Sequence, residues 1–235
     1  MKIGIAADDL TSASDGAAPF LSNGHTCEVW FDHQLVPSAF SGVLSIDKDS
    51  RARTRAEAVQ RSRAAMLKLA DADILYQTVD STIRGHVEAE VLAALATCGR
   101  KSALFAPAFP NAGRTTVNGE QLLNGMPVNR TAFALDPMHP VASANISGLF
   151  VSIRDHDVRL IRLAEVRALQ PSTLQAGPER LLIADAETQD DLNRLVMSVG
   201  APRDMLFCGS PGMARALAHR FRGSGIALPK SPSNE

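Results

Sequence analysis

Short apolar segments alternate along this chain with longer amphipathic ones, and this alternation constrains the fold more than any other feature. The stretches between the apolar runs predict helices at Ala13–Asn23, Thr54–Ala70, Val87–Cys98, Gln189–Val199 and Gly212–Phe221. The apolar runs predict strands at Lys2–Ala6, Thr26–Phe31, Val43–Ile46, Ile74–Val79, Ser102–Ala106, Val158–Ile161, Leu181–Ala184 and Met205–Cys208. Short, almost wholly apolar strands are typical of parallel strands covered on both faces. We therefore expect an α/β protein with a Rossmann-like, doubly wound, mainly parallel sheet and helices on both faces.

Composition and charge exclude several classes of protein. With 45% hydrophobic and 21% charged residues in 235, the chain suits a folded domain with a sizeable core. A net charge of −1 gives no general attraction for nucleic acid or an anionic membrane surface. No apolar run approaches the roughly 20 residues of a membrane span, and the acidic N-terminus does not read as a signal peptide. We expect a cytoplasmic protein without nucleic-acid or membrane partners.

The stretch from 107 to 140 departs from the α/β pattern. It is rich in Pro, Gly and Asn and has little helical period, so we expect an irregular insertion with a hairpin through Gln121–Val128. Loops of this length in compact domains are usually functional or disordered, and the apolar content here favours function. We assign residues 1–222 to one ligand-binding α/β domain. Residues 223–235 are predicted to be a flexible tail or the start of an interdomain linker.

Polar residues gather immediately after the predicted strands. In an open parallel sheet, ligands bind beyond the carboxyl ends of the strands, so these residues are the candidates for a site. The segments that follow the strands are Ala7–Asp15, Asp47–Arg51, Asp80–Gly85, Pro107–Arg114, Asp185–Glu187 and Gly209–Gly212. Most of them carry a carboxylate or an arginine, and the last is a turn of small residues that opens a helix. This convergence predicts a site for a polyol or a hydroxy acid.

The chemistry of these residue types suits such a ligand. Carboxylates such as Asp8, Asp9 and Asp80 accept hydrogen bonds from hydroxyls, and one of them could act as a base. Arginines such as Arg84 and Arg114 can clamp a carboxylate through two hydrogen bonds. Backbone N–H groups at the start of a helix, as in Gly209–Gly212, can receive an anion.

Each of these features also has a purely structural interpretation. An aspartate after a strand commonly caps the next helix. Arg84 could pair with Glu88 one turn further along a helix, and Gly209–Gly212 could be an ordinary turn. The functional interpretation depends on the whole set meeting in one place.

Sharper catalytic motifs are absent from the sequence. It has no Walker A loop, GxGxxG, HExxH or GxSxG motif, and its three cysteines form no CxxC pair. Asp155–Asp157 resembles a metal-ligand cluster but has no second ligand set, so we predict no metal site. A hydrolase or aldolase is the weakest hypothesis. Lys48, the nearest candidate for an active-site lysine, lies between Asp47 and Asp49, whose charges argue against a neutral amine.

Four of the strand-end segments resemble motifs of one enzyme family, the four-carbon acid sugar kinases. The resemblance covers nearly the whole chain, in order, and Asn118–Gly119 and Asp136–Pro137 also fall where that family has them. Ser12 stands where the family motif has glycine, and its side chain could narrow the approach of a ligand to the backbone. The matching segments are Ala7–Asp15 with "ADDLTGAxD", Asp80–Gly85 with "DSTLRG", Pro107–Thr115 with "PAFPxxGRT" and Gly209–Gly212 with "GSAGL".

The resemblance implies the sugar-acid-binding domain of an ATP- and Mg²⁺-dependent kinase that acts on erythronate, threonate or 3-oxo-tetronate. It also implies that the family's C-terminal nucleotide-binding domain is absent from this chain, so a nucleotide-binding domain or subunit is an expected partner. A homo-oligomer is compatible with the sequence. A non-catalytic module that binds a sugar acid or regulates a relative is the alternative. We assign Asp80 as the catalytic base; the expected substrate-binding residues are Asp8, Asp9, Ser81, Arg84, Arg114, Gly209 and Ser210.

Overall fold

The computed structural model describes residues 1–31, 40–154 and 157–225 and confirms the doubly wound α/β fold. The strands of the described residues form an eight-stranded sheet in the order β2-β3-β1-β4-β11-β5-β10-β9, and each neighbouring pair is parallel. The strands are β1 (Lys2–Ala7), β2 (Cys27–Phe31), β3 (Gly42–Asp47), β4 (Ile74–Thr78), β5 (Ser102–Ala106), β9 (Val158–Ile161), β10 (Leu181–Ala184) and β11 (Met205–Gly209). Every predicted strand is therefore confirmed.

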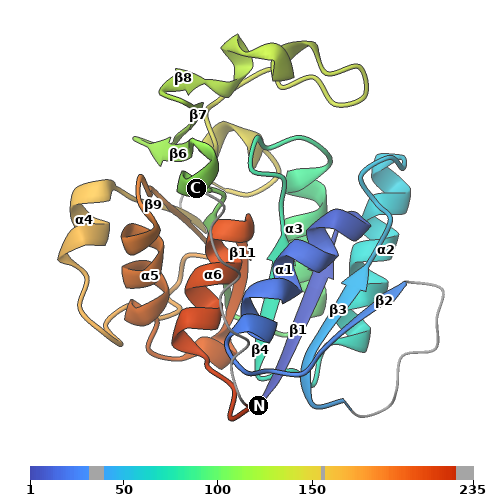
Figure 1. The fold of residues 1–235 in the computed structure, drawn as a ribbon. Helices are drawn as coiled ribbons and strands as arrows, with labels where there is room; N and C mark the ends of the chain where they lie inside the picture. Colours follow the sequence, from blue (N-terminus) through green and yellow to red (C-terminus); the bar gives the residue numbers. More distant parts are fainter. Residues whose placement is uncertain (32–39, 155–156, 226–235) are drawn as a thin grey trace, which may run out of the picture.

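Helices cover both faces of the sheet (Figure 1). On one face α1 and α5 pack on either side of α6, and α4 packs on α5; on the other face α2 packs against α3. Two clusters of buried apolar residues, one under each layer of helices, form the core. The bounds are α1 (Leu10–Ser22), α2 (Arg55–Lys68), α3 (Val87–Thr97), α4 (Leu163–Ala168), α5 (Gln189–Ser198) and α6 (Pro211–Arg220).

The helices begin where local sequence provides a cap. Thr54 and Glu57 form a reciprocal capping box at the start of α2, and the side chains of Asp9 and Ser210 cap α1 and α6. The five predicted helices are confirmed within a few residues at each end. The sequence analysis missed α4, because six residues are too few to show a helical period.

The insertion forms a small antiparallel sheet that projects above the main sheet in Figure 1. Its strands are β6 (Arg114–Val117), β7 (Glu120–Leu123) and β8 (Met126–Pro127), followed by short 3₁₀ turns. The predicted hairpin corresponds to β7 and β8. The longer pairing, β6 with β7, was missed, although the turn Asn118–Gly119 has the left-handed backbone (φ 54° and 77°) that an Asn-Gly hairpin turn requires.

The predicted tail begins with contacts to the domain. The backbone N–H of Gly223 donates to the carbonyl of Asn23, and that of Gly225 donates to the carbonyl of Gly24. Residues 226–235, the rest of the predicted tail or linker, lie outside the described residues.

Candidate functional site

The strand order creates a natural opening between β1 and β4. From β1 the chain crosses through α1 toward β2 and β3 on one side, whereas from β4 it crosses through α3 to β5 on the other. At such a topological switch point the loops after two adjacent strands diverge and leave a crevice at the carboxyl edge of the sheet.

A cavity of about 210 Å³ lies in this crevice. It is smaller than the roughly 300–1,000 Å³ typical of sites for drug-sized ligands, so it suits a small polar molecule. Its walls come from the loops after β1, β3, β4, β5 and β11, which are far apart in the sequence. The lining residues are Asp9, Thr11, Ser12, Asp15, Arg51, Val79, Asp80, Ser81, Phe109, Arg114 and Pro211. Five of the six strand-end segments predicted to meet therefore do so in the structure, whereas Asp185–Glu187 does not line the cavity.

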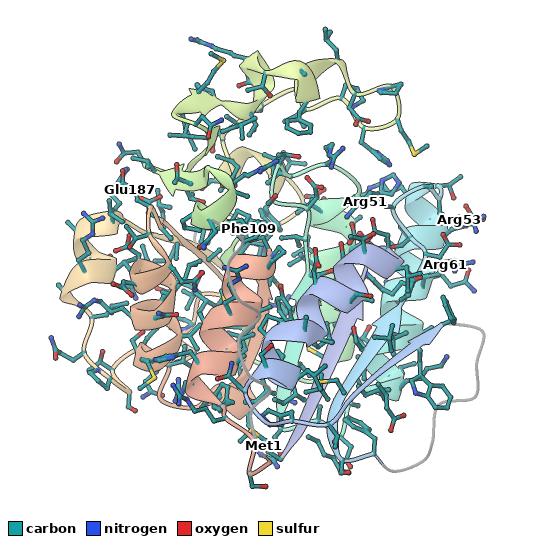
Figure 2. All side chains as sticks on the ribbon, in the orientation of Figure 1. Met1, Arg51, Arg53, Arg61, Phe109 and Glu187 are labelled. Carbon is teal, nitrogen blue, oxygen red and sulfur yellow. The ribbon has the colours of Figure 1, made fainter. Side chains whose placement is uncertain are left out.

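Arg51 lies at the centre of the charged groups around the cavity and contacts three carboxylates. Its Nε lies 2.7 Å from Asp8 Oδ2, its Nη1 lies 2.6 Å from Asp9 Oδ2, and its Nη2 lies 4.0 Å from Asp80 Oδ2. The same Nη2 donates to the Ser12 hydroxyl at 3.1 Å, so the side chain that replaces the family's glycine holds the arginine. Figure 2 shows Arg51 and Phe109 above the main sheet and below the projecting insertion. Arg51 was not selected from the sequence, although its segment, Asp47–Arg51, follows the third strand.

Asp8 and Asp80 have different electrostatic surroundings. Burial raises the pKa of the Asp8 carboxyl above its ordinary value, and the Arg51 guanidinium offsets this only in part. Burial also acts to raise the pKa of Asp80, but hydrogen bonds from Arg84 and Thr82, together with the charges of Arg84 and Arg51, outweigh it and lower that pKa. Asp80 is therefore a stabilised carboxylate, which makes it a weak base.

Arg84 does not line the cavity, contrary to the clamp expected from the sequence. Its Nη2 lies 2.7 Å from Asp80 Oδ2, its Nη1 lies 3.2 Å from Asp136 Oδ2, and its guanidinium stacks over the ring of Phe133 at 4.9 Å. The alternative pairing with Glu88 is also wrong, because Glu88 lies next to Arg55 instead. Arg84 links the insertion to the loop after β4.

Arg114 does line the cavity, as expected. Its Nη1 donates to the carbonyl of Ala112, while its Nε is buried with no hydrogen-bond partner among the described residues. Because Arg114 lines the cavity, it brings a positive charge to the cavity wall.

Gly209 and Ser210 occupy positions different from those expected of ligand-binding residues. Ser210 is fully buried, and its hydroxyl donates to the carbonyl of Ala108 at 2.6 Å and accepts from the N–H of Gly212. A Cβ at Gly209 would lie 2.5 Å from the carbonyl oxygen of Ala106. The turn is glycine-rich because two backbones approach each other there. Of this segment only Pro211 lines the cavity.

Lys48 and Asp185, two further polar residues considered from the sequence, have their partners within the fold. Lys48 does not pair with Asp47 or Asp49; it is buried and forms an ion pair with Glu90. Asp185 accepts hydrogen bonds from the backbone N–H groups of Asn118, Gly119 and Leu163. Across residues 1–31, 40–154 and 157–225, no three His, Cys, Asp or Glu side chains are arranged to hold a metal, and Asp155 and His156 lie outside that part.

Comparisons with known proteins agree with this geometry. A family model described as "Sugar-binding N-terminal domain" matches residues 3–217. The D-threonate kinase of Salmonella typhimurium is 34% identical over 92% of this chain, and the D-erythronate kinase of Heliobacterium modesticaldum is 34% identical over 81% of it. The chain belongs to the four-carbon acid sugar kinase family. It spans about half the length of these family members, 53% of the first and 46% of the second.

The fold of this kinase-family chain also occurs in solved structures. A Bordetella bronchiseptica protein, a domain-swapped dimer with bound citrate, is 30% identical with a TM-score of 0.79; the match covers 92% of this chain and 55% of that one. In the part of the chain that the structure describes, no helix is long and apolar enough to span a bilayer.

Proposed function

We propose that this chain is the substrate-binding domain of an ATP-dependent kinase that phosphorylates a four-carbon sugar acid of the erythronate, threonate or 3-oxo-tetronate class. The observation that carries the proposal is that Arg51 and Arg114 line one small cavity together with Asp9, Asp15 and Asp80. Guanidinium groups bind carboxylates and carboxylate groups accept hydrogen bonds from hydroxyls, which are the two functions of a sugar acid. The names of the related kinases support the same class of substrate.

The roles of the residues follow from their positions. In the proposal Arg114 and Arg51 bind the substrate carboxylate, and Asp9 and Ser81 hold its hydroxyls. Asp8 and Arg84, which do not line the cavity, fix Arg51 and Asp80.

We propose a catalytic base other than Asp80, the residue assigned from the sequence. Asp80 is paired with Arg84, and its lowered pKa disfavours proton uptake. Asp15 also lines the cavity, and within the described residues its carboxylate has neither a hydrogen bond nor an ion pair. We therefore propose that Asp15, and not Asp80, accepts the proton from the attacking hydroxyl of the substrate.

The described residues do not fit ATP or Mg²⁺. The helix start after β11 has its glycines packed against backbone, with Gly212 N–H already bonded to Ser210, so it offers no open cradle for phosphates. Asp8, Asp9 and Asp80 are each paired with an arginine, and no three His, Cys, Asp or Glu side chains of the described residues are arranged to hold a metal ion. The proposal therefore assigns nucleotide and magnesium to a nucleotide-binding domain or subunit, where they would supply the phosphoryl group and neutralise its charge.

Two further expectations belong to the same proposal. The Bordetella relative binds citrate, a small hydroxy acid with three carboxylates and one hydroxyl, and forms a domain-swapped dimer, so a small acid ligand and a homo-oligomer are proposed for this chain as well. The cytoplasm, where ATP is available, is the proposed location.

Calorimetric titration with D-threonate, D-erythronate and 3-oxo-tetronate tests the proposal. The wild-type chain should bind at least one of these acids, and Arg114→Met should weaken binding at least about tenfold, since one charge-assisted pair is lost. Arg203→Met is the matched control, because Arg203 is exposed and pairs with Asp73 away from the cavity. Absence of binding to all three acids, or equal binding by Arg114→Met, would contradict the proposal.

A non-catalytic sugar-acid-binding or regulatory module is the second candidate, because the described residues surround a small polar cavity but offer no open cradle for the phosphates of ATP. Incubation with acid, ATP and Mg²⁺ distinguishes the two. Phosphorylated product, with the chain alone or with an added nucleotide-binding subunit, supports the kinase; binding that never leads to turnover supports the module.

A further inference from the structure

A buried ion pair lies beneath the candidate site and takes no part in the roles proposed above. The side chain of Lys48 is fully buried, and its Nζ lies 2.8 Å from Glu90 Oε1 and 2.9 Å from the hydroxyl of Ser62. Ser50 donates a further hydrogen bond, of 2.5 Å, to the same Glu90 oxygen. Removing two charges from water is costly, so a pair of this kind persists only with close geometry and additional hydrogen bonds, which these two serines provide.

The pair joins three parts of the fold. Ser62 belongs to α2, Glu90 belongs to α3, and Lys48 and Ser50 belong to the loop after β3. Helix α3 itself begins directly after the loop Asp80–Gly85. The pair therefore relates the loop that carries Arg51 to the helix that follows the loop carrying Asp80.

The turn between Lys48 and Arg51 is held tightly at its backbone as well. Lys48 N–H donates to Ala7 O at 2.8 Å, and Ser50 N–H and Arg51 N–H both donate to Asp8 O, at 2.9 and 3.2 Å. Asp49 adopts a left-handed backbone (φ 47°), which costs a non-glycine residue energy and must be stabilised by its surroundings. The side chains on either side of Asp49, those of Lys48 and Ser50, both end on Glu90.

We propose that Lys48 and Glu90 are positioning residues, which hold the turn from Lys48 to Arg51 so that the Arg51 guanidinium faces the acid-binding cavity. This inference rests on the proposed function for its consequence, acid binding, but not for its structural content. Neither side chain lines the cavity, so the pair acts through Arg51 and does not touch the ligand. Misplacing a binding group by about an ångström can reduce binding or catalysis by up to about a hundredfold.

The test removes both charges while keeping the volume, in the double variant Lys48→Met/Glu90→Met. Single substitutions would leave one buried charge unpaired and could prevent folding. The expected result is a loss of D-threonate or D-erythronate affinity of about tenfold or more. Leu195→Ala is the control: Leu195 is fully buried in α5 on the opposite face of the sheet, so it lowers stability without approaching the turn.

A second readout does not depend on the ligand. The Nε–H of Arg51 donates to Asp8, so its hydrogen exchange, followed by nitrogen-15 NMR, reports how firmly the guanidinium is held. Exchange should be at least about tenfold faster in the double variant, as expected when a protecting hydrogen bond is loosened, and unchanged in Leu195→Ala. If wild-type protein binds none of the acids, the proposed function fails and this exchange rate alone decides the inference.

Ser50→Ala serves if the double variant does not fold. It removes only the hydrogen bond from the turn to Glu90, and a smaller effect in the same direction, about threefold in affinity and in exchange, is expected. Unchanged Arg51 exchange in the folded variant, whichever of the two is used, would overturn the proposal.

Discussion

An aspartate at the carboxyl end of an apolar strand occurs at two places along the edge of the main sheet, and its surroundings differ between them. Asp80 follows β4 and Asp185 follows β10, and both are buried carboxylates at the carboxyl end of an apolar strand. Asp80 is bonded to the side chain of Arg84 and lines a cavity. Asp185 accepts three backbone N–H groups, from the turn of the β6–β7 hairpin and the first residue of α4.

The difference lies in what covers the strand end. At β10 the hairpin turn and α4 close over the carboxylate, so it satisfies backbone donors and is inaccessible to a ligand. Between β1 and β4 the chain leaves in opposite directions, so the polar groups there surround a space. Whether a carboxylate after a strand faces a cavity thus depends on the topology around it and not on its own chemistry.

The largest effect is expected from Arg51→Met. Asp8, fully dependent on this guanidinium for its ion pair, would remain buried, so the free energy of unfolding should fall by about 2–3 kcal/mol. Acid binding should fall at least about thirtyfold, since about 2 kcal/mol of charge-assisted bonding is lost. Urea unfolding and calorimetric titration measure the two effects. A variant that binds as wild type does would remove Arg51 from the site.

Asp185→Ala tests the other strand end, that of β10, where the carboxylate is covered. Three backbone donors lose their acceptor, so the free energy of unfolding should fall by about 2 kcal/mol. The affinity for a sugar acid, measured well below the unfolding transition, should stay within about twofold of wild type. A loss of affinity comparable with that of Arg51→Met would show that the two strand ends do not differ as described.

Gly209→Ala tests the packing role given to the turn after β11. The added methyl group would lie 2.5 Å from the carbonyl oxygen of Ala106, so a loss of about 1–3 kcal/mol in unfolding free energy is expected. Thermal unfolding of this variant beside Gly148→Ala gives the comparison, because a Cβ at Gly148 would meet only ordinary contacts, the nearest 3.5 Å away at Asn145 Cγ, and its φ is not positive. Equal losses in the two variants would exclude backbone crowding as the reason for Gly209.

The smallest effect concerns Arg84 and the pH dependence of stability. Because the pKa of Asp80 is lowered in the folded protein, its pairing stabilises the fold above the ordinary value of 3.8 and is lost as pH falls through the lower folded value. Arg84→Met should therefore cost about 1 kcal/mol at pH 7, and wild type and variant should converge as pH falls below 3.8. Unfolding at pH 7, 5 and 3 measures this. A difference that is constant with pH would contradict the pairing.

Much of the fold could be predicted because short apolar runs identify parallel strands directly. What escaped was short or polar: α4 has six residues, and β6 contains Thr115 and Thr116, which do not read as a buried strand. The Asn118–Gly119 signal for the hairpin was present in the sequence and was overlooked.

The position of the cavity and the presence of Arg114 in it could be predicted, but not that Arg51 lines it and Arg84 does not. Arg84 is occupied by Asp136, 52 residues away, in an insertion whose path no local pattern reveals. Lys48 reads as part of an exposed charged run, yet it pairs with Glu90, 42 residues away. Side-chain partners across such separations depend on the tertiary structure, whereas a strand end depends only on local sequence.

A crystal structure of the chain with D-threonate tests the central claim most directly. The account predicts the acid in the crevice between β1 and β4, with its carboxylate on Arg114 and Arg51 and its hydroxyls on Asp9 and Ser81. An acid bound elsewhere, for instance in the groove between α1 and α6 beside Arg215, with the crevice left unoccupied, would contradict it.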